Sequence, residues 1–290
     1  MKEYSITAED AGERLDAFLM SREQMPRGVF MKALRTNKIK VNRKKQEPSY
    51  RLTEGDRVQS YVLREEKIIS PSIVYEDGHV MIAAKPAGLL CMGEGDSFFA
   101  RVEAYLHGKG ERAFPVHRLD FNTRGLMIYA KTESALAGLT DLIRRRVIKK
   151  SYLLVAEGSF RKKQGRLIHY LFKDARKKQV YITDEPVKGA KTAILDYQVI
   201  RERGGLSLVE CLLHTGRTHQ IRAQMAHVGH PLVGDDKYGH ASENRKRREK
   251  RQLLCAYKLS FPEGLSGALS GVSGREFILR DIDFLRRCFP

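Results

Sequence analysis

The apolar residues near the start of the chain recur at the spacing of short helices. Two sets share this pattern: Leu15, Phe18 and Leu19, and then Phe30, Ala33 and Leu34. Residues three and four apart lie on one side of a helix, so each set predicts a helix with one buried face, the second beginning just after Pro26. An edge strand at 39–42, a tight turn at 54–56 and a strand at 57–62 follow. These elements predict a small α+β domain over residues 1–63.

Farther along, the pattern changes to apolar runs and alternations that are typical of strands. Beyond a polar stretch, predicted as a linker over 64–72, we expect a hairpin at 73–86 and strands at 126–130, 152–157, 191–200, 206–213 and 253–259. We expect helices at 100–106 and 132–146, a strand–turn–helix segment at 213–229, and an exposed, mobile loop at 245–251. The second domain, 73–290, is therefore predicted to be α+β with a mixed, mainly antiparallel sheet.

The net charge of the chain indicates what kind of partner it binds. Lys and Arg number 53 against 35 Asp and Glu, a formal net charge of +18. An excess of this size is typical of proteins that bind a polyanion, and nucleic acid is favoured. Eight basic residues and no acid lie close together in the first domain: Arg27, Lys32, Arg35, Lys38, Lys40, Arg43, Lys44 and Lys45. Because both helices already use one face for the core, these cations share the remaining surface, which predicts a phosphate-binding patch.

Other features narrow the class of protein. The four cysteines are widely separated and form no CxxC pair, which predicts reduced core residues. The first residues lack the apolar stretch of a signal peptide, and no apolar run has the length of a membrane span. We therefore expect a cytoplasmic protein without a membrane partner, and a monomer.

One carboxylate stands out in the segment 114–131. Asp120 precedes a polar turn, and the apolar run at 126–130 follows that turn. Four positive or ionisable side chains surround it in the sequence: His117, Arg118, Arg124 and Lys131. A lone Asp in such a place is most often a turn former, so local chemistry leaves this interpretation open beside a catalytic one.

A group of histidines raises the question of a metal. His214, His219, His227 and His230 lie within one short segment. Their spacing fits neither the HExxH helix nor a Cys/His zinc finger, so we expect no metal site. The chain also lacks a Walker A sequence and a nucleophile elbow. No cofactor is predicted.

Three motifs, in order, resemble one family. They are His117-Arg118-Leu119-Asp120 with Thr123 and Gly125, then Thr215-Gly-Arg-Thr-His-Gln-Ile-Arg222, then Gly234-Asp235 with Tyr238-Gly239. Over residues 73–285 the chain resembles the RluA-type pseudouridine synthases. Asn122 and Arg124 depart from that family's pattern. The first domain resembles the S4 RNA-binding domain through Arg14-Leu15-Asp16, Lys40-Val41-Asn42 and Gly55-Asp56, with Pro26-Arg27-Gly28 where a serine-arginine pair is usual.

The resemblance implies an activity and roles for residues. The chain is expected to isomerise uridine to pseudouridine in structured RNA, with large-subunit ribosomal RNA favoured over transfer RNA. It implies that Asp120 acts at the glycosidic bond, that Tyr152 takes the proton from the base carbon, and that Arg222 pairs with Asp120. Arg118 would fill the space left by the flipped nucleotide. The substrate-binding residues that it implies are Arg118, His117, Thr123, Arg124, Arg217, His219 and Ile221.

Two alternatives remain at this stage. A non-catalytic RNA-binding or ribosome-assembly protein could share the scaffold, and a transfer-RNA pseudouridine synthase could share the chemistry. The geometric prediction is sharper: the Asp120 carboxylate should lie within salt-bridge distance of Arg222, with Arg118 and Arg124 as rival partners.

Overall fold

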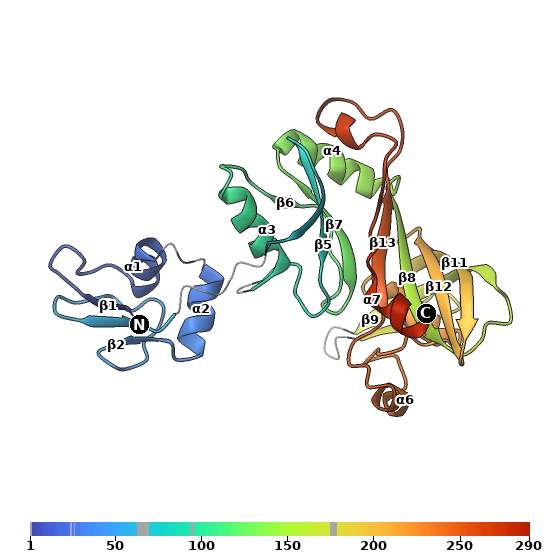
Figure 1. The fold of residues 1–290 in the computed structure, drawn as a ribbon, viewed down its shortest axis with the longest axis horizontal. Helices are drawn as coiled ribbons and strands as arrows, with labels where there is room; N and C mark the ends of the chain where they lie inside the picture. The colour runs from blue at the N-terminus through green and yellow to red at the C-terminus, as the bar shows by residue number, and fades with distance from the viewer. Residues whose placement is uncertain (1, 24, 26, 63–69, 94–95, 175–178) are drawn as a thin grey trace. The chain divides into compact units, whose positions relative to one another are not determined.

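The computed structural model describes residues 2–290 except 24, 26, 63–69, 94–95 and 175–178 (Figure 1). Its contacts divide the chain into two compact units. The first is Met1–Ser70 with Met92–Lys109, and the second is Pro71–Cys91 with Gly110–Pro290. Residues 92–109, which the sequence places in the second domain, thus group with the first unit. Most of the predicted linker 64–72 falls at 63–69, outside the described residues.

The first unit contains a three-stranded sheet and short helices. Its elements are β1 (Lys2–Ser5), α1 (Leu15–Arg22), α2 (Arg27–Arg35), β2 (Ile39–Val41), β3 (Arg57–Ser60) and α3 (Phe98–His107). The sheet order is β1-β3-β2, with both pairs antiparallel, so the prediction of an edge strand at β2 is confirmed. All six apolar residues of the two helical sets are buried in one cluster, which confirms both predicted helix faces.

The helix α3 is longer than the predicted 100–106. The Ser97 side chain accepts a hydrogen bond from the backbone N–H of Ala100, so the helix begins at Phe98. An N-cap of this kind satisfies a donor that the first turn would otherwise leave unpaired.

The second unit is built on one large sheet. Its main strands are β4 (Ser72–Glu76), β5 (Val80–Lys85), β7 (Arg124–Ala130), β8 (Lys149–Glu157), β9 (Gln164–Asp174), β10 (Gln179–Thr183), β11 (Lys191–Arg203), β12 (Leu206–Leu213) and β13 (Leu254–Ser260). The order is β10-β9-β11-β12-β8-β13-β7-β5-β4, and β6 (Phe114–Pro115) and β14 (Glu276–Ile278) pair with β7 and β13. Only the pair of β7 and β13 is parallel among these described strands, which confirms the predicted mixed, mainly antiparallel sheet.

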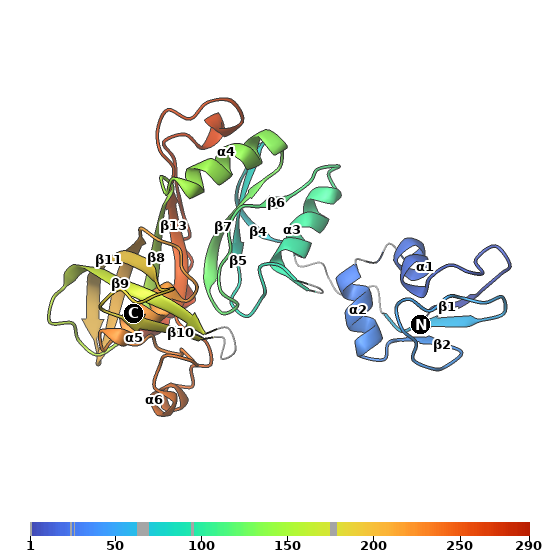
Figure 2. The same ribbon diagram turned by 180° about the vertical axis from the view of Figure 1, so that it is seen from behind.

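Helices complete the second unit. They are α4 (Glu133–Arg144), α5 (Gln220–His227), α6 (Ala241–Lys246), α7 (Asp283–Cys288) and the 3-10 helix η1 (Gly267–Val272). Thr132 caps α4 as predicted, by accepting a hydrogen bond from Ala135 N–H. The apolar face of α4 packs on β5 and β7 through Leu139, Ile82 and Ile128. On the other arm of the sheet, α5 lies beside β10 (Figure 2), where Ala223 packs against Val180.

Two segments differ from the sequence prediction. The hairpin of β9 and β10 was not predicted, because charged and polar residues interrupt its apolar alternation; only one side of it, including Leu171 and Val180, is buried. The predicted mobile loop 245–251 is wrong at its start, since Arg245 and Lys246 end the helix α6. None of the helices that the structure describes is long and apolar enough to span a bilayer.

A single glycine, Gly125, allows β7 and β13 to approach each other closely in the middle of the sheet. Gly125 pairs with Ala256 at the parallel junction of β7 and β13, which lies beside β8 (Figure 1). A Cβ added at Gly125 would lie 2.3 Å from the Ala256 carbonyl oxygen, and its φ is +134°. A residue without a side chain is therefore required. The close approach brings the loop before β7, which holds Asp120, toward the strand that holds Tyr152.

Candidate active site

A cavity of about 400 Å³ gathers most of the residues that the sequence singled out. Its lining includes Asp120, Tyr152 and Arg222, together with His117, Arg118, Thr123, Arg217, His219 and Ile221. They come from three places: the loop before β7, the strand β8, and the turn from β12 into α5. The cavity therefore joins motifs that lie about a hundred residues apart in the chain.

A buried amine, that of Lys85, holds the loop that carries Asp120 through hydrogen bonds to backbone carbonyls. Lys85, at the end of β5, is fully buried and its Nζ donates hydrogen bonds to the carbonyls of Pro86, Leu89 and Phe121 at 2.8, 2.8 and 3.1 Å. Burial lowers the pKa of Lys85 to about 8, whereas the three carbonyls favour its charged form. Because Phe121 is the next residue after Asp120, this lysine fixes the backbone at the carboxylate.

Two further contacts hold the same loop. The Cys91 thiol donates to the Leu119 carbonyl at 3.0 Å and accepts from the Leu119 N–H at 3.1 Å. Thr123 is buried, donates its N–H to the Asp120 carbonyl, and accepts a hydrogen bond from Gln252 at its hydroxyl. Thr123 was predicted to bind substrate; its observed contacts shape the turn after Asp120.

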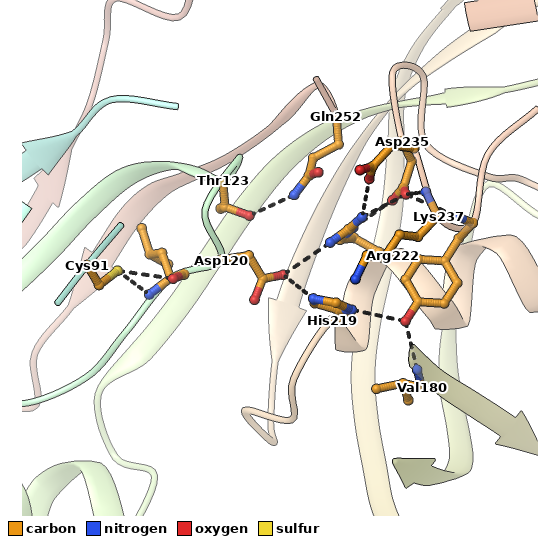
Figure 3. A network of polar contacts seen from close by, with 12 residues as sticks. Cys91, Asp120, Thr123, Val180, His219, Arg222, Asp235, Lys237 and Gln252 are labelled. Atoms are coloured by element: carbon orange, nitrogen blue, oxygen red, sulfur yellow. Dashed lines mark hydrogen bonds and ion pairs between the residues drawn. The ribbon is translucent and has the colours of Figure 1, made fainter. Parts of the chain in front are cut away.

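Arg222 faces Asp120 as predicted. Its Nη1 lies 3.8 Å from Asp120 Oδ2, so the predicted salt-bridge distance is confirmed (Figure 3). Its tighter partner is Asp235, which receives hydrogen bonds from Arg222 Nε and Nη2 at 2.7 and 2.8 Å. Asp236 accepts a third, at 3.1 Å. Arg222 is thus locked by a bidentate pair and turns its remaining nitrogen toward Asp120.

Asp235 is a site residue for which the sequence analysis assigned no role. It is buried, and its Oδ1 also accepts the backbone N–H groups of Lys237 and Tyr238. Burial acts to raise the pKa of Asp235, but the hydrogen bonds and charge of Arg222 outweigh burial and hold the pKa below its usual value. Burial likewise opposes the charge of Arg222, and Asp235 reverses that effect to raise the pKa of the guanidinium. The Gly234-Asp235 motif was a signal that could have identified this partner.

Tyr152 lies on β8 in the wall of the cavity and is buried. Burial raises the pKa of Tyr152, and the negative charge of Asp120 raises it further. The phenol is therefore protonated at neutral pH. It makes no hydrogen bond with another described residue, so its hydroxyl is available to a ligand in the cavity.

His117 has a structural partner within the sheet. Its Nε2 accepts the Ile128 backbone N–H of β7 at 3.0 Å. Burial lowers the pKa of His117 to about 3, with the charge of Lys150 adding to this effect. The imidazole is therefore neutral, as an acceptor at Nε2 has to be. His117 lines the cavity as predicted, but it also completes the hydrogen bonding of a central strand.

Four cations line the cavity without a carboxylate partner among the described residues: Arg118, Arg146, Lys150 and Arg217. Arg118 is exposed, whereas Arg217 donates from Nε to the Thr192 carbonyl. Burial lowers the pKa of Lys150, a residue to which the sequence analysis assigned no role. Cations that lack a protein partner are the groups to which phosphate oxygens bind.

Arg124 does not belong to this cavity. It pairs with Asp283 at 2.8 Å and donates to the Asp281 carbonyl, and it lines a second cavity of about 370 Å³. Its position as the first residue of β7, beyond the turn, directs it to the segment around α7. The prediction that Arg124 lies with the other substrate-binding residues is therefore wrong, and Arg124 is no rival of Arg222 for Asp120.

A histidine cluster outside the cavity tests the expectation about metal. His169, Asp184 and His227 offer ligand atoms within 4.8 Å of one another. The Gln224 side-chain nitrogen, which also lies near two backbone carbonyls, donates to His169 Nδ1 at 3.0 Å. A neutral imidazole that accepts at Nδ1 carries its hydrogen on Nε2, the atom that faces Asp184. This arrangement favours a hydrogen-bonded cluster over a metal site, and the absence of metal stays a prediction.

Comparisons with known proteins agree with the motifs. Residues 79–227 match the family model described as RNA pseudouridylate synthase. The chain is 32% identical over 283 residues to the ribosomal large subunit pseudouridine synthase C of Escherichia coli (strain K12), covering 90% of this chain and 88% of that protein. It is 29% identical over 254 residues to the protein of the same name from Buchnera aphidicola subsp. Acyrthosiphon pisum, covering 81% and 79%.

Solved structures share the fold. The structure titled Human RNA Pseudouridylate Synthase Domain Containing 4 matches with a TM-score of 0.61 and 22% identity, over 74% of this chain and 92% of that one. Human RNA Pseudouridylate Synthase Domain Containing 1 matches with a TM-score of 0.58 and 23% identity, over 78% and 97%. At this identity the likeness concerns the fold.

Proposed function

This chain belongs to the RNA pseudouridylate synthase family, and on that premise we propose that the cavity around Asp120 isomerises a flipped uridine of large-subunit ribosomal RNA to pseudouridine. The observation that carries the proposal is the trio in one cavity: Asp120, Tyr152 and the Arg222 that is locked toward Asp120. The reaction detaches a base and reattaches it through carbon, so it needs a carboxylate that acts at the sugar, a proton relay at the base, and no redox group.

Asp120 supplies the carboxylate. Its Oδ2 lies 3.8 Å from Arg222 Nη1, and no described residue donates a hydrogen bond to Oδ1. A carboxylate held at one oxygen presents the other to the ribose, either to attack C1′ or to remove the proton at C2′. Either route breaks the N1–C1′ bond and frees the uracil to rotate within the cavity.

Tyr152 supplies the proton relay. After C5 bonds to C1′, that carbon must lose its proton, while the former N1 must gain one. A phenol that is protonated at neutral pH takes the C5 proton only by passing its own proton on, and the acceptor is N1, which in the neutral C5-linked base is an imine-type nitrogen double-bonded to C6. Protons and bonds then balance without any other reactant.

Flipping requires contacts outside the base pocket. Arg118 is exposed at the rim, where a planar cation can fill the space that the nucleotide leaves. Arg217, His219 and Ile221 line the wall beside it and are assigned to the flipped nucleotide. Lys150 adds a half-buried cation for a phosphate oxygen.

The first unit is assigned to RNA binding as an S4-like domain over residues 1–63. Its sheet order β1-β3-β2 and its two helices form a core of their own. The predicted patch, Arg27 to Lys45, begins in α2 and continues over β2 and the following turn. Arg35, Lys38, Arg43, Lys44 and Lys45 are exposed and have no carboxylate within ion-pair distance among the described residues. These cations are the phosphate contacts of the proposal.

Ribosomal RNA is favoured over transfer RNA because the relatives described above are named as pseudouridine synthases of the large ribosomal subunit. A monomer in the cytoplasm with no membrane partner completes the proposal. A scaffold that only binds RNA is disfavoured because Asp120, Tyr152 and Arg222 are all present and share one cavity.

Pseudouridine mapping tests the function directly. Ribosomal and transfer RNA from cells that lack the gene should be compared with RNA from the same cells carrying the wild-type gene or the Asp120→Asn gene. We expect one or more uridines of large-subunit RNA to be modified only with the wild-type gene. Modification confined to transfer RNA would show that the substrate is transfer RNA. No difference in either RNA would favour the alternative of a non-catalytic RNA-binding protein.

A further inference from the structure

A chain of polar contacts reaches Asp120 from the far side of the cavity. His219 Nε2 lies 4.0 Å from Asp120 Oδ2, and His219 Nδ1 lies 3.0 Å from the Tyr238 hydroxyl. The hydroxyl in turn accepts the backbone N–H of Val180, on β10, at 2.9 Å. Figure 3 labels Val180, His219 and Asp120 and draws the contacts that link them as dashed lines.

The hydrogen bond at the far end of this chain has a fixed direction, and the other hydrogens are assigned from it. A backbone N–H can only donate, so the Tyr238 oxygen accepts from Val180. The phenol keeps its own hydrogen to donate, and among the described residues His219 Nδ1, at 3.0 Å, is the acceptor within reach. A neutral imidazole that accepts at Nδ1 carries its one hydrogen on Nε2, and Nε2 faces Asp120.

The groups around His219 favour this neutral form. Burial is the largest effect and lowers the pKa of His219. Among the charged neighbours, Asp120 and Asp235 act to raise that pKa, while Arg222 and Lys237 act to lower it. The net direction is downward, so a neutral His219 can turn an Nε2 hydrogen toward Asp120, at 4.0 Å, without adding a charge to the site.

The backbone of His219 has a conformation that is uncommon for a residue with a side chain. His219 is the N-cap residue of α5, with φ 54° and ψ 21° in the left-handed region. Such a conformation is unfavourable for a residue with a side chain and persists at positions where the surroundings enforce it. It lets the imidazole and the Arg222 side chain, three residues later in α5, approach the same carboxylate oxygen.

We propose that Tyr238 and His219 are positioning residues that fix Asp120 through its Oδ2, with Tyr238 setting the tautomer of His219 and His219 directing a hydrogen to the carboxylate. Together with Arg222 they leave Oδ1 as the oxygen that reacts. Contacts of 3.8 and 4.0 Å shorten to hydrogen bonds when RNA fills the cavity. The inference rests on the proposed role of Asp120 and adds the device that selects one of its oxygens.

Tyr238→Phe is the decisive variant. It keeps the ring, whose face lies 5.3 Å from the Arg222 guanidinium, and removes only the hydroxyl. Without that donor the tautomer of His219 is no longer set. We expect kcat to fall about tenfold with KM changed less than about twofold, as for other partners that orient a histidine from behind. Tyr181→Phe is the matched control: Tyr181 neighbours Val180 on β10 but is exposed, and its loss of a hydroxyl should leave kcat unchanged.

Nitrogen NMR of the folded protein reads the tautomer without using activity. In the wild type we expect the proton of His219 on Nε2, and in Tyr238→Phe a mixture of both tautomers. A wild-type proton on Nδ1, or a Tyr238→Phe variant with unchanged kcat, overturns the inference. His219→Asn, which tolerates the left-handed backbone but is too short to reach Asp120, should lower kcat at least as much as Tyr238→Phe. If the wild type made no pseudouridine while its His219 kept the Nε2 proton, the proposed function would fail and the contact chain would remain.

Discussion

The cations of the basic patch in the first unit and Arg222 in the cavity of the second unit are held in opposite ways. Five of the patch residues, Arg35, Lys38, Arg43, Lys44 and Lys45, are exposed and have no carboxylate partner among the described residues. In the cavity, Arg222 is buried and locked by Asp235 before it faces Asp120. A cation without a protein partner is free to neutralise a phosphate, whereas a paired, buried cation orients one chemical group.

The two regions should therefore fail differently. A change at Asp120, Arg222 or Asp235 should remove chemistry or stability at nearly constant RNA affinity. A change in the patch should weaken RNA binding in a salt-dependent manner and leave the chemical step intact. The four changes below test this contrast, from the largest expected effect to the smallest.

Asp120→Asn should abolish catalysis. Asn keeps the shape of the side chain but removes the anionic oxygen, so we expect turnover to fall by about 10³-fold or more with RNA affinity retained. Single-turnover assays by mass spectrometry and filter binding on the same RNA would measure both. Turnover close to that of the wild type would remove Asp120 from the mechanism.

Asp235→Asn should destabilise the folded protein at the active site. It leaves the Arg222 guanidinium buried without its bidentate partner, and we expect the free energy of unfolding to fall by about 3–5 kcal/mol. The double variant Arg222→Met with Asp235→Leu removes both charges and should recover most of that stability while staying inactive. Denaturant titration checks the stability, and a single variant as stable as the wild type would show that Asp120 or Asp236 suffices for Arg222.

Acid should weaken the second unit through His117. Its pKa is about 3 in the folded protein against an ordinary value of 6.5, so between these pH values the unfolded chain binds more protons. The free energy of unfolding should therefore fall as the pH is lowered from 6.5 toward 3. In His117→Gln, which keeps an acceptor for the Ile128 N–H, this pH dependence should be shallower. Equal pH profiles for the two proteins would contradict the assignment.

Neutralising part of the patch should have the mildest effect. Arg35→Gln, Lys38→Gln and Lys44→Gln together should lower the slope of log affinity against log salt by about 2–3, because each lost phosphate contact contributes roughly 0.7–0.9. The turnover of bound RNA should not change. A second triple variant, Lys162→Gln, Lys188→Gln and Arg203→Gln, removes the same charge from exposed positions of the second unit. If both triple variants change the slope equally, the charge acts through the net field and the patch is not the binding site.

The sequence by itself determined what depends on neighbours along the chain. The spacing of Leu15, Phe18 and Leu19 defined a buried helix face, and the run of cations from Arg27 to Lys45 defined a charged surface. Thr132 as a cap, and Leu126–Ala130 as a buried strand, were equally local. The β9–β10 hairpin was not predicted because many of its residues face solvent, and their polar side chains interrupt the alternation of apolar residues that is typical of a strand.

Only the tertiary structure decided which side chains meet. Motif order indicated that Asp120, Tyr152 and Arg222 act together, but the lock of Arg222 by Asp235 and the contact of Tyr238 with His219 depend on a turn that folds back onto α5. Arg124, the nearer cation in sequence, is turned to Asp283 because it begins β7 beyond the turn. Helices, caps and buried strands depend on residues that lie near one another in the sequence. The pairing of buried charges depends instead on how strands and turns pack, and the spacing of residues in the sequence does not specify that packing.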